Sequence, residues 1–279
     1  CEHAYSYCYL YALAQEEGKR ARKAYAFRQA RNFADLEKQE CINETIEKTA
    51  FSLNYIPLPK SEAYTVVFSP KAFLALFGAF SNLWNARSVL DQKSLSTKDS
   101  IGEQIAHRDF NFTDNALHEE NLSKTLFDQE GTPTRALDIV KNGVLQSFIH
   151  NEETARRFGV EPTGHATIGA RPSATDNFYH IHSSNINTSQ KDPEKEEYLV
   201  YVEQVTALHA GVQSIQGSFS LPVDGWVSTK DGKRSFESGV VSGDIKDALQ
   251  NIIYMDPEPT VTESGICPHV WIKNIKVTG

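Results

Sequence analysis

Near the start of the chain, the pattern of hydrophobic and polar positions predicts a strand, a helix and a second strand. Residues 4–12 are rich in aromatic side chains, which is typical of a strand. A helix is predicted over 36–53, with Asp35 as its N-cap, because apolar and small residues recur at helical spacing. This stripe comprises Ile42, Ile46, Thr49, Ala50 and Leu53. Residues 64–68 (YTVVF) are β-branched and aromatic and predict a buried strand.

The most apolar segment of the chain follows this second strand. Ser69 and Pro70 are typical of the start of a helix, since serine caps free N–H groups and proline at the first position loses no hydrogen bond. The helix predicted over 70–86 is apolar on nearly every side. We therefore expect it to be buried within the domain or at a subunit contact.

Turn signals and short strands dominate the second half of the chain. Asn142-Gly143 lies between two apolar runs and predicts a hairpin, and a short helix over 152–158 should end at Gly159. A further helix is predicted over 244–253 and a terminal strand over 270–277. The expected fold class is therefore α+β, with a mostly antiparallel sheet and long helices in the N-terminal third.

Composition and charge narrow the classes of function. Of 279 residues, 28 are Lys or Arg and 36 are Asp or Glu, so the net charge of −8 would repel the phosphates of a nucleic acid. No apolar run is long enough for a transmembrane helix. The four cysteines form no CxxC pair, which favours reduced thiols in a cytoplasmic protein. Basic residues within 15–32 are expected to form a solvated face, the alternative being an arm for an acidic partner.

Histidines provide the main candidate chemistry. His180 and His182 are two residues apart, so a strand would place both imidazoles on one face, at a spacing that can chelate a metal. A third ligand would have to come from elsewhere in the chain, and the candidates are His165, His209, Asp176, Cys267 and His269. Ordinary sheet or loop histidines are the alternative interpretation.

Two further motifs are weaker. Cys267 and His269 are separated by a proline, which is poor geometry for a Cys–His nucleophilic dyad. His118-Glu119 lacks the second histidine of a zinc-protease helix, because residue 122 is Leu. The residues by themselves therefore identify no active site.

A set of short motifs resembles the TldD/PmbA family, historically called modulators of DNA gyrase, and follows that family's order. The motifs are 127–134 (FDQEGTPT), 142–145 (NGVL), 155–159 (ARRFG), 163–166 (TGHA), 217–220 (GSFS), 242–245 (SGDI) and 276–279 (KVTG). The resemblance implies that 61–279 is similar to the family's C-terminal domain, and that 1–60 is the end of a preceding region. The family's N-terminal domain is not recognised in the sequence, so a fragment or processed product is expected.

The resemblance also separates two branches of the family. The TldD branch carries HExxxH on a helix, whose histidines bind zinc, whereas the PmbA branch lacks this motif. The corresponding residues 73–82 (FLALFGAFSN) contain no His, Glu, Asp or Cys, which are the ligands zinc needs. The resemblance therefore implies a non-catalytic subunit with no cofactor and no catalytic residue of its own. It would pair with a zinc-bearing TldD-like partner and help to enclose a peptide, which would bind along a strand edge.

Contacts with the peptide or the partner are expected at Gly131, Thr132, Thr163, Gly164 and His165. Two alternative functions stay open. One is a homodimeric family member with its own metal-dependent hydrolase activity, using His180, His182 and a third ligand such as His165. The other is a nucleic-acid-associated regulator. The sequence does not identify the peptide, a homodimer or heterodimer, or a role for Cys267.

Overall fold

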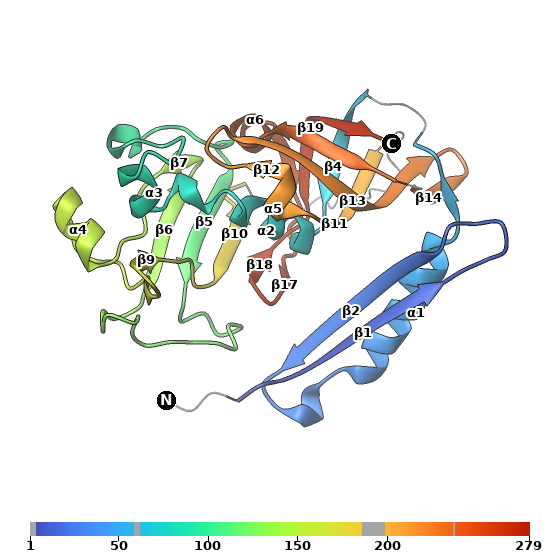
Figure 1. Cartoon of the computed structure of the whole chain (residues 1–279), viewed down its shortest axis with the longest axis horizontal. Helices are drawn as coiled ribbons and strands as arrows, with labels where there is room; N and C mark the ends of the chain where they lie inside the picture. The colour runs from blue at the N-terminus through green and yellow to red at the C-terminus, as the bar shows by residue number, and fades with distance from the viewer. Residues whose placement is uncertain (1–3, 59–61, 186–198, 237) are drawn as a thin grey trace.

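The structure, a computed structural model, describes residues 4–58, 62–185, 199–236 and 238–279. It is an α+β fold in which sheets dominate, as Figure 1 shows. In the described part of the chain, no helix is both long and apolar enough to cross a lipid bilayer.

The larger sheet contains nine of the described strands. Along its main path the spatial order is β11 (Leu199–Val205), β4 (Glu62–Phe68), β19 (Val270–Thr278), β15 (Val240–Asp244), β13 (Ser218–Thr229), β14 (Gly232–Phe236) and β3 (Tyr55–Ile56). Two short strands join it at the side, β12 (Val212–Gln213) on β13 and β16 (Ile252–Met255) on β19. The strands predicted over 64–68 and 270–277 are β4 and β19, so both predictions are confirmed.

A smaller sheet of six described strands lies beside it. Its order is β17 (Thr260–Val261), β18 (Gly265–Cys267), β10 (Tyr179–Ser183), β5 (Phe110–Asn115), β6 (Ala136–Lys141) and β7 (Val144–Leu145). Asn142 and Gly143 join β6 to β7 with φ values of 51° and 75°, which confirms the predicted hairpin turn. β8 (Ala166–Ile168) and β9 (Pro172–Ala174) form a separate hairpin. Most strand pairs in these sheets are antiparallel, as predicted; β4–β11, β10–β18 and β3–β14 are parallel.

Most of the helices are short. They are α2 (Pro70–Gly78), α3 (Ala86–Leu90), α4 (Glu152–Phe158), α5 (Leu208–Gly211) and α6 (Ile245–Gln250), with 3₁₀ turns η1 (Phe33–Asp35), η2 (Ser81–Leu83) and η3 (Lys98–Ser100). α2 lies between the two sheets (Figure 1) and is buried on most sides. The predicted helix over 152–158 is confirmed as α4, and Gly159 ends it at φ 70°.

The single helix predicted over 70–86 is broken into α2, η2 and α3, so the expectation of long helices in the N-terminal third is not confirmed. In one continuous helix, Phe80 and Trp84 would share a face. The breaks instead let Phe80 pack on Phe219 of the larger sheet while Trp84 packs on Phe112 of the smaller one. Tertiary packing of two buried aromatic rings therefore overrides a favourable helical pattern.

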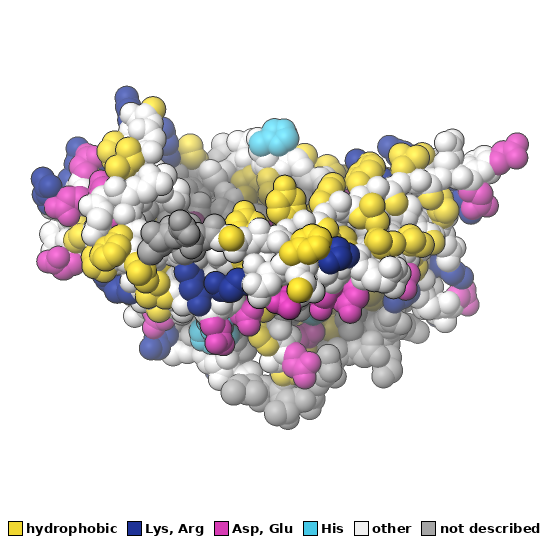
Figure 2. Space-filling view, turned by 90° about the horizontal axis from the view of Figure 1, so that it is seen from below, with side chains coloured by type: hydrophobic (Ala, Val, Ile, Leu, Met, Phe, Trp, Pro, Cys, Tyr) yellow, Lys and Arg dark blue, Asp and Glu magenta, His cyan; other side chains and the backbone are white. Residues whose placement is uncertain are grey.

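The N-terminal elements form a unit that stands apart from the two sheets (Figure 1). We call this unit the arm; it consists of β1 (Ser6–Ala14), β2 (Arg22–Ala30) and α1 (Lys38–Ser52). β1 and β2 pair antiparallel, which confirms the predicted N-terminal strand, and α1 packs on one face of the pair. The other face carries exposed aromatic residues, and Figure 2 shows hydrophobic side chains gathered in the half of the molecule where the arm lies.

The expected N-cap of α1 is wrong, and of its expected apolar stripe only Thr49 is buried. Asp35 lies in η1, and α1 begins at Lys38 after Glu37, which makes no side-chain cap hydrogen bond. Ile42 and Ile46 are 40% and 57% exposed, whereas Cys41, Thr45 and Thr49 are buried against the strands.

Local hydrogen bonds explain why threonines can take the buried face of α1. The Thr45 hydroxyl donates to the carbonyl of Cys41 at 2.7 Å, and the Thr49 hydroxyl donates to the carbonyl of Thr45 at 2.6 Å. Because each hydroxyl is satisfied within the helix, its burial leaves no unpaired polar group. The small side chains then let the helix lie close to the two strands.

The corrected orientation of α1 predicts a small effect for one substitution and a large loss of stability for another three residues away. Ile46→Lys should change the free energy of unfolding by less than about 0.5 kcal/mol, because Ile46 faces solvent. Thr49→Lys should lower it by more than about 2 kcal/mol, because it forces a charge into the arm. Chemical denaturation of both variants checks this, and a larger loss for Ile46→Lys would contradict the orientation.

Candidate functional site

α2 is held in place by its first residue and by aromatic packing along one side. The Ser69 hydroxyl accepts from the N–H of Ala72 at 3.1 Å and donates to the carbonyl of Glu203 at 2.7 Å, which ties the helix start to β11. Phe77 stacks on Trp84 with ring centroids 4.6 Å apart and meets Phe112 edge-on at 5.1 Å. The helix is therefore fixed between the sheets by apolar contacts.

The surroundings of α2 offer no metal centre. Within the residues that the structure describes, no three or more His, Cys, Asp or Glu side chains are grouped so as to hold a metal ion. Cys267, in the neighbouring β18, is fully buried, and burial raises its pKa well above that of a free thiol. Its thiol donates to the carbonyl of Pro268 at 3.2 Å. A neutral, enclosed thiol is a poor nucleophile.

His269 lies in a different environment from Cys267. Its Nδ1 is 3.2 Å from a carboxylate oxygen of Asp256, and its Nε2 is 3.0 Å from the hydroxyl of Tyr201. The indole of Trp271 also donates to Asp256, at 3.1 Å. Both ring nitrogens of His269 are therefore taken up by Asp256 and Tyr201. His269 is not left free to pair with Cys267 as the weak Cys–His candidate in the sequence would require.

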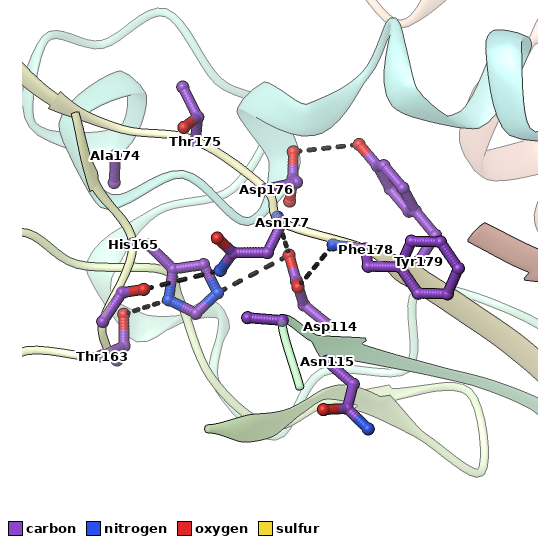
Figure 3. Close-up of polar contacts among 12 residues, drawn as sticks. Asp114, Asn115, Thr163, His165, Ala174, Thr175, Asp176, Asn177, Phe178 and Tyr179 are labelled. Carbon is purple, nitrogen blue, oxygen red and sulfur yellow. Dashed lines mark hydrogen bonds and ion pairs between the residues drawn. The ribbon is translucent and has the colours of Figure 1, made fainter. Parts of the chain in front are cut away.

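A buried polar network links β5, β10 and the loops beside them (Figure 3). The Asp114 carboxylate accepts the backbone N–H groups of Asn177 and Phe178 at 2.8 and 3.0 Å. Its second neighbour is His165, whose Nε2 is 3.6 Å away, while the Nδ1 of His165 is 2.9 Å from the hydroxyl of Thr163. The Asp114 and His165 side chains are both completely buried. This network therefore orders the segment before β10 rather than presenting groups to solvent.

A second carboxyl group, Asp176, lies next to this network. It accepts from the indole N–H of Trp84 at 2.6 Å and from the hydroxyl of Tyr179 at 2.9 Å. Burial, and then the charge of Asp114, raise the pKa of Asp176 to about 6. The sequence suggested Asp176 only as a metal ligand, and the structure instead places it as a hydrogen-bond acceptor that joins the smaller sheet to the segment after α2.

The loop over 127–134 rests directly on this network. The Asp128 carboxylate accepts the backbone N–H of Ala166 at 2.9 Å. A side chain at Gly164, whose φ is 77°, would come within 2.6 Å of the carbonyl of Pro133. Glycine is therefore required for the loop to lie this close.

The five expected contact residues are thus near one another but unequally accessible. Gly131 is exposed and Thr132 half-buried, whereas Thr163, Gly164 and His165 are buried beneath the loop. The three buried residues are placed to support the loop, and the two outer ones are placed where another molecule can reach them.

His180 and His182 share one face of β10, as their spacing predicts, but the structure does not bring His165 to them. His165 lies beside Asp114 on the opposite, buried face of the sheet. The ring that approaches is His118, which is 5.5 Å from His180 between centroids, while His180 and His182 are 5.0 Å apart. Burial lowers the pKa of both strand histidines. Sequence reasoning missed His118 because it precedes β10 by more than sixty residues.

A cleft of about 580 Å³ separates the arm from the smaller sheet. Phe27, Arg28 and Gln29 of β2 line one wall, and 260–263 of the β17–β18 hairpin line the other. In the described ranges, β2 pairs only with β1 and β17 only with β18, so each wall contributes a strand with one unpaired edge. Sequence spacing gives no signal for this cleft, because its walls are more than two hundred residues apart.

Two of the basic residues that join the arm to the body are Lys71 and Arg31. Lys71, in the first turn of α2, lies 3.1 Å from a carboxylate oxygen of Glu263 and 4.7 Å from the ring centroid of Tyr25. At the far end, the Arg31 guanidinium donates to the carbonyl of Glu119 at 3.4 Å. These contacts keep the two strand edges on opposite sides of the cleft.

Comparison with known proteins gives consistent matches. Residues 61–279 match the family described as PmbA/TldA metallopeptidase C-terminal domain. The metalloprotease PmbA of Escherichia coli O157:H7 is 26% identical over 279 residues, covering 99% of this chain and 58% of that protein. A zinc metalloprotease TldD homologue of Saccharolobus solfataricus is 24% identical, covering 79% of this chain and 53% of the relative. The chain therefore spans little more than half the length of these relatives.

Solved structures share the fold. A Thermotoga maritima protein described as a modulator of a DNA gyrase superposes with a TM-score of 0.87 at 28% identity, over 98% of this chain and 62% of that one. TldE from Thermococcus kodakarensis superposes with a TM-score of 0.82 at 22% identity, over 99% of this chain and 63% of that one.

The raised pKa of Asp176 predicts a specific dependence of stability on pH. A carboxyl whose pKa rises from 3.8 to about 6 on folding stabilises the fold fully below pH 4, and this contribution is lost as the pH rises through 6. The loss is at most about 3 kcal/mol. Asp176→Asn should remove this component, whereas Asp231→Asn, in an exposed turn, should keep it. Unfolding free energies measured from pH 4 to 7 test this, and parallel curves for wild type and Asp176→Asn would refute it.

The lowered pKa of His150 predicts the opposite pH dependence of stability from that of Asp176. Burial, and then the charge of His165, lower its pKa from 6.5 to about 4. Its contribution is therefore complete above pH 6.5 and is lost as the pH falls through 4. His150→Gln should lose less stability than wild type between pH 6.5 and 4, by up to about 3 kcal/mol. Exposed His209→Gln is the control, and equal acid sensitivity in all three proteins would contradict the assignment.

Proposed function

Because the chain belongs to the PmbA/TldD metallopeptidase family, we propose that it is the metal-free subunit of a peptide-processing protease. In this proposal it pairs with a zinc-bearing TldD-like chain, and the two together enclose the peptide. The relatives are named metalloproteases, and the division of labour between two chains is our inference.

The observation that carries the proposal is the chemistry of α2. Lys71 is the only ionisable residue in the helix, and its ammonium group is turned to Glu263 and the arm. The remaining side chains are apolar and pack on both sheets. A zinc site needs about three N, S or O ligands and an open position for water, and an apolar helix held between sheets supplies neither. The catalytic metal would then belong to the partner.

The cleft supports a role in holding the peptide. An extended peptide can add to an unpaired strand edge through main-chain hydrogen bonds, largely independently of its sequence. Two such edges face the cleft, from β2 and from β17. Its volume of about 580 Å³ falls in the range of pockets that bury a small ligand or a few residues of peptide.

One residue of β17 offers a direct test of this edge. The N–H of Thr262 donates to the carbonyl of Gly265, so the alternation of an antiparallel hairpin turns the N–H of Val261 away from β18, toward the unpaired edge. Val261→Pro removes that donor, while Val261→Thr keeps it.

We expect the chain to form a complex with a TldD-like protein in size-exclusion chromatography. Hydrolysis of an unstructured peptide should require the complex, and elemental analysis should find zinc in the partner and not in this chain. Val261→Pro should raise the KM of the complex about tenfold, whereas Val261→Thr should leave it within about twofold. Stoichiometric zinc on the isolated chain together with hydrolysis by it would overturn the proposal, as would the lack of any complex.

A further inference from the structure

Two thiols meet where α1 packs on β1. Residues of β1 alternate between its two faces, so Tyr7 and Tyr9 point to solvent while Cys8 points to the helix. Cys41 lies in the first turns of α1 on its buried face and is 1% exposed. Because α1 packs on this face of β1, Cys8 and Cys41 lie on facing sides of the same packing surface.

A guanidinium group accompanies the two thiols. Arg28 of β2 is the cross-strand partner of Cys8, and its side chain forms ion pairs with Glu44 at 2.5 Å and Glu37 at 3.6 Å. Glu44 lies in α1, and Glu37 is the residue just before its first turn, so the two flank Cys41 along the chain. A cation beside a cysteine favours its thiolate form. Burial and the neighbouring Cys8 raise the pKa of Cys41, and Arg28 offsets part of that rise. Cys8 is half-buried and is the thiol that a small molecule can reach.

The arm has little other packing to hold it together. The buried residues of the arm and of the turn before α1 are Ala26, Leu36, Cys41, Thr45 and Thr49, and none belongs to the main hydrophobic core. A covalent link from β1 to α1 would close a loop from residue 8 to residue 41 that contains both strands. Such a link reduces the freedom of the unfolded arm, which is where small units gain most from a cross-link.

We propose that Cys8 and Cys41 are a redox-active dithiol, and that low-molecular-weight disulfides such as oxidised glutathione convert it to a disulfide that fixes α1 to β1. The Cys8 thiolate attacks one sulfur of the oxidant and releases one glutathione thiolate. The Cys41 thiolate then attacks the sulfur of Cys8 and displaces the second glutathione. One disulfide is consumed and one is formed, and the two released thiolates take up the two protons lost by the cysteines. This inference is independent of the proposed protease role.

Mass spectrometry of the full chain tests the proposal. After incubation with oxidised glutathione and alkylation of the remaining thiols, peptide mapping should find a Cys8–Cys41 cross-link in the wild type. Cys41→Ala should stop at the first step, leaving glutathione attached to Cys8, and Cys8→Ala should form neither species. Cys267→Ala is the matched control and should form the cross-link as the wild type does.

The same samples give a second measurement. Oxidation should raise the midpoint of thermal unfolding of the arm by about 5 °C in the wild type and in Cys267→Ala, and not in Cys41→Ala. A cross-link that maps to Cys1 or Cys267 would overturn the proposal. So would wild type and Cys41→Ala carrying the same glutathione adduct on Cys8, since the second thiol would then take no part.

Discussion

An apolar helix enclosed between two sheets is the constraint on which the rest of the structure depends. α2 is buried on most sides, with only Lys71, Ala75 and Gly78 partly exposed. Both sheets must therefore cover it, and the aromatic residues after it must divide between them. Phe80 is placed on the larger sheet and Trp84 on the smaller one, which requires the chain to turn twice between α2 and α3. Trp84 in turn binds Asp176, so the position of α2 also fixes the polar network beside β10.

This arrangement separates two kinds of polar residue. Asp114, His165 and Asp176 are enclosed, and their partners are backbone N–H groups for Asp114, Thr163 for His165, and Trp84 and Tyr179 for Asp176. They therefore act as a frame beneath the loop over 127–134. The cleft, in contrast, is built from strand edges and from the contacts that Lys71 makes with the arm. The proposed peptide recognition therefore uses main-chain groups at the surface, while the ionisable side chains of the interior keep the surface segments in position.

Local sequence signals predicted those elements whose structure is decided locally. The Asn142-Gly143 turn and the Gly159 helix end require φ values that few other residues adopt, and both were predicted correctly. The predicted orientation of α1 was wrong. Threonine can be buried when its hydroxyl bonds within the helix, and Ile42 and Ile46 are instead exposed. The resemblance to a known family led us to expect contacts with a peptide or partner at 131–132 and 163–165, and that expectation stays a prediction. The contact of His118 with His180 and the two walls of the cleft depend on tertiary structure, and nothing in their spacing along the chain could have indicated them.

The tryptophans and the tyrosines are distributed differently between the body of the protein and the arm. Its three tryptophans, Trp84, Trp226 and Trp271, all lie in the two sheets or next to α2, whereas the arm contains tyrosine and phenylalanine and no tryptophan. Light absorbed by indole alone thus reports on the body of the protein and, through Trp226, on its boundary with the arm. Phenolic absorption samples both parts, so the difference between the two optical signals isolates the behaviour of the appendage without any added label.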